Sequence, residues 1–381
     1  MTTDVISTAD YEICALTVGP RAVEVSWSDG LVSRFHHMWL RDNCQQLLHA
    51  TTRHRIFETS DIPDDVHPSS AVVGSDGSLV ITWAHDDHVS PFAPSWLREN
   101  DYGNGASHIP PTVTPWDAAA IRSTLPRCTH HDLINNIEAR IGFLDGFFRY
   151  GLAILTGVPC ESGTVLQVGE LLGEIRVTSW GKVFDVISMP EANSVAYTSL
   201  PLVTHTDEGY RDPAPTVQLQ HFIRADASGG ASTLVDGFAV AEALRRDRPD
   251  LFELLATTML DFHFTDATAE HHGRGPIISL HPDGTIRQVR YSNHSALPFR
   301  IPADRMEAFY GAYRVFGKMR ESDQYCFRIA LGAGDMYLVD NHRVLHGRTG
   351  FASSGARHLQ SCYIERDEVA SRLAVLKRRS D

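Results

Sequence analysis

Several features that assign a chain to a specialised class are missing from these 381 residues. The six cysteines, at positions 14, 44, 128, 160, 326 and 362, contain no CxxC pair, which argues against a disulfide scaffold and for a reducing compartment. Lysine and arginine (34) are outnumbered by aspartate and glutamate (47), giving a net charge of −13. This balance excludes the basic surface of a protein that binds nucleic acids or anionic membranes.

Long apolar runs are also missing. No stretch approaches the ~20 consecutive apolar residues that a membrane-spanning helix needs, and the first twelve residues, MTTDVISTADYE, lack the apolar centre of a signal peptide. We therefore expect a cytoplasmic protein with no membrane span. The chain is otherwise ordinary for a globular protein, with 43% hydrophobic and 21% charged residues, and its length allows one large or two medium domains.

The first hundred residues have the pattern of short strands. Residues 12–40 alternate apolar and polar side chains between the turn sequences GP and SDG, and SAVVGSDGSLVITWAH is typical of a hairpin. The run NDYGNGASHIPPTVTPW (100–116) has no hydrophobic period and is typical of a linker. We therefore predict a small β-rich domain over residues 1–105 and a second domain over residues 106–381.

The second domain combines early helices with later strands. LINNIEARIGFLDGFFRYG has apolar side chains at helical spacing (134, 137, 141 and 144) and ends at Gly151, and GTVLQVGELLGEI predicts a further helix. From about residue 195 strands dominate, among them TVQLQHFI, ASTLVDG, DMYLVDN and RHLQSCYIE, with helices over 238–257 and 303–318. This order favours an α+β, mostly β fold, a double-stranded β-helix (jelly roll) with helical buttresses.

The stretch THTDEGYRD (204–212) contains a candidate metal-binding pair. His205 and Asp207 are two residues apart, so on an extended strand both side chains point to the same face. His-x-Asp occurs four times in the chain, so a further ligand must single this pair out. DNHRVLHGR supplies one, and we favour His346 over His342 because LHGR ends a predicted strand. Two imidazoles and one carboxylate form the facial triad of non-haem Fe(II) oxygenases, and Arg357 on the next strand could pair with the distal carboxylate of a keto acid.

Four segments make the sequence similar to a known family. NSVAYTSLPLVTHTDEGYRDPAPTVQLQHF, GGASTLVDGF and DNHRVLHGR resemble the 2-oxoglutarate-dependent oxygenases of the taurine dioxygenase type, in particular the γ-butyrobetaine and trimethyllysine hydroxylase branch. HMWLRDNC resembles the small N-terminal accessory domain of that branch. The resemblance covers nearly the whole chain and implies Fe(II) as cofactor, 2-oxoglutarate and O₂ as co-substrates, and succinate and CO₂ as products.

The resemblance also implies roles for individual residues. His205, Asp207 and His346 would hold the iron, and Arg357 would anchor the C5 carboxylate of 2-oxoglutarate. Ser232, in GGAS, stands where the family often has a hydroxyl residue that touches the co-substrate. A plain turn serine is the alternative interpretation of Ser232.

The substrate pocket of the family corresponds to a further group of positions. In γ-butyrobetaine hydroxylases an aromatic cage receives the trimethylammonium group through cation–π attraction. The corresponding cage positions here are Trp180, Phe184, Tyr197 and Tyr363. At each of them an ordinary core aromatic is the alternative interpretation. One cage position differs, because Glu208 stands where some members have an aromatic residue. A carboxylate can accept an N–H from a less methylated ammonium, so Glu208 predicts a preference for such an amine; a solvated loop glutamate is the alternative.

The acid end of the pocket departs from the family as well. Two asparagines that hold the substrate carboxylate in the family correspond to Ser194 and Ser292, whose shorter side chains leave room for a bulkier anion. Lys182 and Arg290 lie near these segments and could supply positive charge. We therefore expect hydroxylation of a small zwitterionic, amine-bearing acid similar to γ-butyrobetaine. The alternative substrate is an aminoalkylphosphonate such as 2-aminoethylphosphonate or its N-trimethyl form.

Further expectations concern the accessory domain and the partners. The family binds zinc there through three closely spaced cysteines and a later histidine, whereas only Cys44, His49 and His88 remain as candidates here. Because a structural zinc site has four ligands, we expect no zinc. We also expect a homodimer with a small-molecule substrate and no nucleic-acid partner. The rival classes are a non-catalytic metal-binding jelly roll and a metal-dependent isomerase or hydrolase on a cupin-like barrel, and the latter would not need Arg357.

Overall fold

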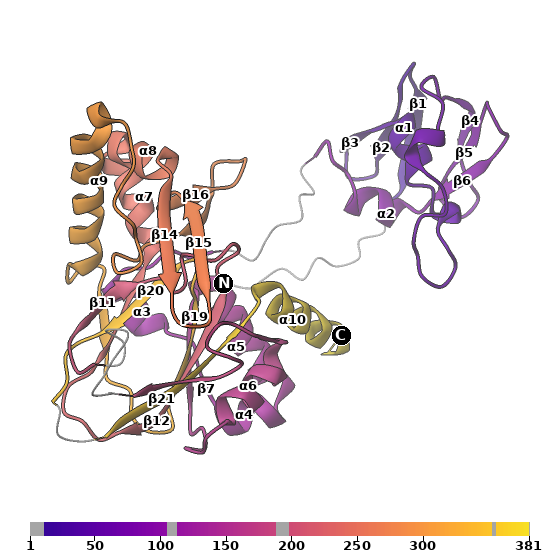
Figure 1. The fold of residues 1–381 in the computed structure, drawn as a ribbon. Helices are drawn as coiled ribbons and strands as arrows, with labels where there is room; N and C mark the ends of the chain where they lie inside the picture. Colours follow the sequence, from indigo (N-terminus) through magenta and orange to yellow (C-terminus); the bar gives the residue numbers. More distant parts are fainter. Residues whose placement is uncertain (1–10, 105–112, 188–197, 353–355, 381) are drawn as a thin grey trace. The chain divides into compact units, whose positions relative to one another are not determined.

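The structure, a computed structural model, describes residues 11–104, 113–187, 198–352 and 356–380. The chain forms two compact units, Met1–Pro110 and Pro111–Asp381 (Figure 1). Two predicted pocket residues, Ser194 and Tyr197, lie outside the described residues. Among the helices of the described part, none has the length and apolar character that crossing a bilayer requires.

The first unit is built from two three-stranded antiparallel sheets. One contains β1 (Ile13–Val18), β2 (Ala22–Trp27) and β3 (Val32–His36), and the other contains β4 (Pro68–Val73), β5 (Leu79–Trp83) and β6 (Val89–Phe92). Short helical segments accompany them: α1 (His37–Asp42), η1 (Gln45–Leu47), η2 (Thr59–Asp61) and α2 (Pro94–Glu99). Alternate residues of β2 and β5 enter one shared core, as the alternating sequence pattern predicts. The predicted run of strands ends at His36, because the next six residues are helical.

The second unit contains the two sheets of a jelly roll. The seven-stranded sheet has the order β10 (Phe184–Ile187), β21 (Arg357–Ile364), β12 (Val217–Ala225), β19 (Met336–Asp340), β8 (Leu152–Thr156) and β7 (Arg127–Thr129), with β9 (Ile175–Arg176) on β21. The four-stranded sheet has the order β11 (Leu202–His205), β20 (Val344–Arg348), β13 (Ser232–Asp236) and β18 (Phe327–Ile329). Side chains of both sheets, including Phe222, Leu234 and Leu359, form one buried core. The mostly β fold with helical buttresses is confirmed.

Helices support both sheets (Figure 1). Helices α5 (Ile137–Tyr150), α6 (Thr164–Leu172) and α10 (Arg366–Ser380) share a core with the seven-stranded sheet, and α3 (Ala118–Thr124) and α4 (His130–Asn135) lie beside β18 and β7. A second helical layer contains α7 (Gly237–Asp247), α8 (Pro249–Thr257) and α9 (Ala303–Glu321). Two hairpins pack with this layer: β14 (Leu260–Thr265) with β15 (Glu270–Gly275), and β16 (Ile278–Leu280) with β17 (Ile286–Val289).

Two of the predicted helices are divided in the structure. The segment predicted to be one helix up to Gly151 breaks at Asn136, whose side chain caps α5 by accepting a hydrogen bond from the backbone N–H of Ala139. Ile134 and Ile137, predicted on the buried face, are 46% and 47% exposed. The second divided helix is 238–257, which breaks before Pro249 because proline cannot donate the backbone hydrogen bond that continues a helix.

Candidate active site

The site begins where two strands of the smaller sheet run antiparallel. His205, the last residue of β11, lies directly opposite His346 on β20, so strand pairing brings together two imidazoles that are 141 residues apart. Gly347 permits this approach, because a Cβ at that position would clash with the backbone oxygen of Leu202. His346 lies in the middle of β20 rather than at the predicted strand end.

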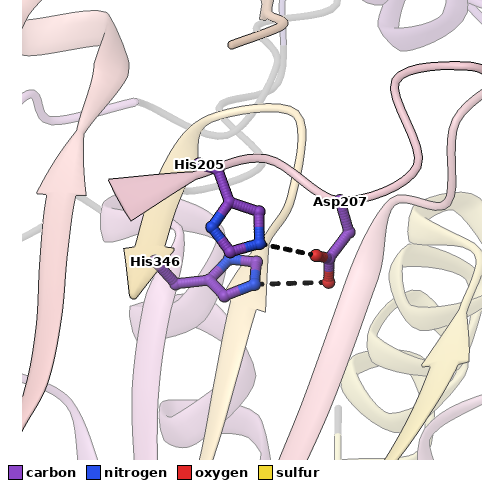
Figure 2. A group of neighbouring side chains, drawn as sticks. All are labelled: His205, Asp207 and His346. Atoms are coloured by element: carbon purple, nitrogen blue, oxygen red, sulfur yellow. Dashed lines mark ion pairs between the residues drawn. The ribbon is translucent and has the colours of Figure 1, made fainter. Parts of the chain in front are cut away.

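Asp207 completes a group of three ligand side chains (Figure 2). The Nε2 atoms of His205 and His346 lie 3.2 Å from Oδ1 and Oδ2 of Asp207, respectively. Both imidazoles are at least 94% buried, since His205 is 6% and His346 is 4% exposed. His342 points elsewhere, with its Nε2 at 3.1 Å from the backbone oxygen of Ala214. The His346 side chain therefore faces Asp207, and the His342 side chain does not.

The protonation states suit a divalent cation. His205 Nδ1 lies 3.0 Å from the backbone oxygen of Val203; a carbonyl oxygen only accepts, so Nδ1 carries the proton and the Nε2 lone pair is available to a metal. Burial opposes ionisation of Asp207, but His346 and His205 hold the pKa of its carboxyl well below the usual value. With a metal bound, the Nε2 lone pairs of the two imidazoles and the ionised carboxylate would form the donor set of a non-haem Fe(II) centre.

A polar shell fixes the position of Asp207. Gln218 Nε2 and the Tyr363 hydroxyl both donate to Asp207 Oδ2, at 2.6 and 2.8 Å. The backbone N–H of Asp207 donates to Asn341 Oδ1 at 2.7 Å, and Asn341 Nδ2 donates back to the backbone oxygen of Asp207. Such partners orient a metal ligand and retain its charge. Tyr363, predicted as a cage aromatic, therefore also supports the metal ligand.

A cavity of about 360 Å³ opens onto this centre. Six of the residues predicted from the sequence to bind substrate or co-substrate line it: Trp180, Phe184, Glu208, Ser292, Arg357 and Tyr363. Ser232 is not among the lining residues; it is buried on β13, opposite Arg348. Lys182 is exposed and Arg290 is buried, and neither lines the cavity.

Glu208 lies in a strained and enclosed position beside the metal ligand. Its backbone φ is 48°, in the left-handed region that residues other than glycine seldom adopt. Its carboxylate pairs with Arg211 Nε at 2.5 Å, and Arg211 Nη2 donates to Ser179 Oγ at 2.6 Å. Burial raises the pKa of Glu208 to about 7, against the opposing effect of Arg211. Glu208 is therefore a buried residue of the cavity wall and not a solvated loop glutamate.

Other lining residues have no sequence signal of their own. Phe264 on β14 stacks on Tyr210 with ring centroids 5.0 Å apart and packs against Trp180 at 5.5 Å, which adds two rings to the aromatic wall. His294 lines the cavity beside the metal ligands, with its ring 4.7 Å from that of His205. Burial lowers the pKa of His294 to about 4. It belongs to a polar group with Ser292 and Ser295, whose hydroxyls are 2.9 Å apart.

Two arginines supply positive charge to another part of the wall. Arg348 and Arg357 both line the cavity, and both guanidinium groups lie over the ring of Phe351, at 5.4 and 5.3 Å. The guanidinium group of Arg357 makes no ion pair or hydrogen bond with any residue in the described part of the chain. Burial lowers its pKa, but the guanidinium remains charged at all relevant pH values. An unpaired, half-buried guanidinium in a cavity is suited to a carboxylate ligand.

The zinc candidates of the first unit are only partly brought together. Cys44 Sγ lies 3.3 Å from His88 Nε2. His49 is exposed, and its Nδ1 accepts a hydrogen bond from the backbone N–H of Thr52. The expectation that this unit holds no zinc stays a prediction.

Comparisons with known proteins agree over almost the full length. Residues 133–363 match the model of the family "Taurine catabolism dioxygenase TauD, TfdA family", and residues 15–98 match "Gamma-butyrobetaine hydroxylase-like, N-terminal". Gamma-butyrobetaine dioxygenase of Pseudomonas sp. (strain AK-1) is 38% identical over 93% of this chain and 94% of its own length. The human gamma-butyrobetaine dioxygenase is 29% identical (95% and 96% covered), and the mitochondrial trimethyllysine dioxygenase of Gallus gallus is 30% identical (95% and 88% covered).

Proposed function

The chain belongs to the taurine catabolism dioxygenase TauD, TfdA family, and we propose that it hydroxylates a small zwitterion similar to γ-butyrobetaine. It is an Fe(II)- and 2-oxoglutarate-dependent dioxygenase, so the non-catalytic and hydrolytic alternatives are set aside. The observation that carries the assignment is the convergence of His205, Asp207 and His346 at one wall of the cavity.

The donor set supports iron at this position. His205 has its Nδ1 committed to a backbone carbonyl, and Asp207 is held ionised between two imidazoles. When bound, Fe(II) supplies the activation of O₂ that couples decarboxylation of 2-oxoglutarate to hydroxylation of the substrate. The hydrogen bonds from Gln218 and Tyr363 keep the Asp207 carboxylate oriented.

Arg357 is the proposed anchor of 2-oxoglutarate. Its planar guanidinium can form two parallel hydrogen bonds with a carboxylate, and none of the described residues competes for it through an ion pair. Arg348 stays close enough to share the Phe351 ring, so the local positive potential favours the dianionic co-substrate. The role first given to Ser232 has no such support, because that side chain lies outside the cavity lining.

The cationic end of the substrate is proposed to lie against a wall that is part aromatic and part acidic. Trp180, Tyr210 and Phe264 offer ring faces that attract any ammonium group. Glu208 adds a carboxylate that has four acceptor positions. Arg211 occupies only part of this capacity, and an N–H of a primary, secondary or tertiary amine can use the rest. A quaternary ammonium has no N–H, which supports a preference for a less methylated amine.

A second candidate substrate is an aminoalkylphosphonate. The acid end of the cavity has the hydroxyls of Ser292 and Ser295 beside His294, a group of short side chains with several donors. A tetrahedral phosphonate with three oxygens can use more of these donors than a planar carboxylate can. The homodimer and the cytoplasmic location stay predictions, which light scattering and cell fractionation would test.

The decisive experiment is a substrate panel scored by substrate-stimulated succinate release. The panel contains γ-butyrobetaine, its dimethyl, monomethyl and unmethylated forms, 2-aminoethylphosphonate and N-trimethyl-2-aminoethylphosphonate. Glu208→Tyr should shift the preference toward the trimethylated forms, whereas the same change at the exposed helical residue Glu253 should not. An identical order of preference in wild type and Glu208→Tyr would remove Glu208 from substrate recognition.

A further inference from the structure

A second group of metal-binding side chains lies on the β14–β15 hairpin. The two strands pair with His263 opposite His272 and Thr265 opposite Glu270. Because side chains alternate along a strand, His263, Glu270 and His272 project from the same face. The Nε2 atoms of both histidines lie 3.2 Å from Glu270 Oε1, and the two rings stack with centroids 4.3 Å apart.

This group has the composition of a divalent-cation site. One ligand atom from each of the three side chains lies within 4.8 Å of the others, so a single ion can contact all three after small side-chain movements. Two imidazoles and one carboxylate suit Zn²⁺, which commonly takes water as its fourth ligand in such sites. His272 and Glu270 are 63% and 64% exposed, so an ion can enter from solvent without unfolding the hairpin.

The hairpin is joined to the cavity on both of its strands. His263 itself lines the cavity, and its backbone N–H donates to the oxygen of Ser295, another lining residue, at 2.9 Å. On the other strand, Gly273 follows His272 and lies so close to the loop after the metal ligands that a Cβ there would be 2.6 Å from the backbone oxygen of Gly209. These contacts connect the hairpin to residues beside the iron ligands.

We propose that His263, Glu270 and His272 form a second, regulatory divalent-cation site that takes Zn²⁺ and whose occupation lowers turnover. Ligation holds the His263 ring toward Glu270 at the cavity wall and restrains the segment that carries Ser295. Both effects oppose the adjustment of the wall to substrate. The binding part of this proposal stands on the hairpin alone, and the effect on turnover rests on the proposed dioxygenase function.

Zinc stoichiometry tests the binding part without any catalytic readout. Calorimetric titration of the full-length, metal-free protein measures the number of Zn²⁺ ions bound per chain. His272→Ala and Glu270→Gln should each bind one Zn²⁺ fewer than wild type. The Asp207→Ala variant lacks the iron site but should still bind the Zn²⁺ ion of the hairpin. His131→Ala, which alters an exposed histidine on α4 (81% exposed), should retain the wild-type stoichiometry. Equal stoichiometry in wild type, His272→Ala and Glu270→Gln would overturn the site.

Zinc inhibition then tests the regulatory part. The measured quantity is the Zn²⁺ concentration that halves succinate release at saturating Fe(II). Loss of an outer-shell partner lowers the affinity of a metal site by roughly 10- to 100-fold. Because His272 is a direct ligand, this concentration should rise by more than that in His272→Ala. Basal turnover of this variant should equal that of wild type, because His272 does not line the cavity. Lost zinc binding with unchanged zinc inhibition would refute the regulatory role. Absence of turnover with every substrate would refute the proposed function but leave the stoichiometry test intact.

Discussion

Replacing Tyr363 with phenylalanine separates two roles that this residue can have. The ring packs against Phe184 with centroids 5.5 Å apart, as a cage residue would, while its hydroxyl donates to Asp207 Oδ2 at 2.8 Å. Tyr363→Phe keeps the ring and removes only the hydroxyl. If the hydroxyl supports the metal ligand, the change must weaken iron binding while leaving the contacts of the ring with the substrate in place.

The expected magnitude follows from the hydrogen bond. Tyr363 is 3% exposed and its partner is ionised, and a hydrogen bond to a charged group contributes about 1.5–3 kcal/mol. At roughly 1.4 kcal/mol per factor of ten, this corresponds to about 10- to 100-fold in Fe(II) affinity, the same range as for loss of an outer-shell partner in other metal sites. Gln218 still donates to the same oxygen, so the lower half of this range is expected.

Fe(II) titration under anaerobic conditions measures the effect, with the KM for substrate measured in parallel. Tyr337→Phe is the matched control: Tyr337 lines the same cavity, but its hydroxyl donates to Gln220 and not to a metal ligand. The Fe(II) affinity of Tyr337→Phe should equal that of wild type. Unchanged Fe(II) affinity in Tyr363→Phe together with a raised KM for substrate would refute the supporting role and leave Tyr363 as a cage residue only.

Three further predictions concern the co-substrate anchor, the metal ligands and a buried histidine. Arg357→Lys retains the charge but loses the planar fork, so the KM for 2-oxoglutarate should rise by the equivalent of about 1–3 kcal/mol; an unchanged value would assign the anchor to another residue. His346→Ala should abolish Fe(II) binding and His342→Ala should preserve it, because the His342 ring bonds a backbone carbonyl; equal losses in metal titrations would contradict the ligand set. Burial lowers the pKa of His221 to about 4, below the unfolded value of about 6.5. The unfolded state therefore binds more protons between these values, and stability falls as the pH falls through this window, by up to about 1.4 kcal/mol per pH unit for one proton. Urea unfolding of His221→Leu should show a shallower fall than wild type, and parallel curves would contradict this.

The sequence was sufficient for features that depend on local pattern. The alternation in β2 and β5, the end of α5 at Gly151 and the strand that carries Asp340 all follow from residues close together in the chain. The divided helices were missed because the capping side chain of Asn136 and the imide nitrogen of Pro249 outweighed an apolar spacing that continued across both breaks. Ile134 and Ile137 keep that spacing but face solvent.

The candidate site divides in the same way. His205 and Asp207 are visible as a local pair, and the segment DNHRVLHGR offers His346 at a predicted strand end, with the family resemblance supporting the same three ligands. The pairing of Glu208 with Arg211 depends on a loop conformation with positive φ, which no local pattern predicted. Phe264 and His294 reach the cavity through a hairpin and a loop far along the chain, so only the tertiary structure identifies them.

The central claim is that this chain oxidises a small zwitterion with O₂ and 2-oxoglutarate at His205, Asp207 and His346. Its most direct test is to incubate the wild-type protein with Fe(II), 2-oxoglutarate, O₂ and γ-butyrobetaine or the preferred member of the substrate panel. Hydroxylated product and succinate are measured by mass spectrometry, with folded Asp207→Ala as the control. We predict equal amounts of product and succinate from wild type and neither from Asp207→Ala. Equal turnover in Asp207→Ala, or hydroxylation by wild type without 2-oxoglutarate, would contradict it.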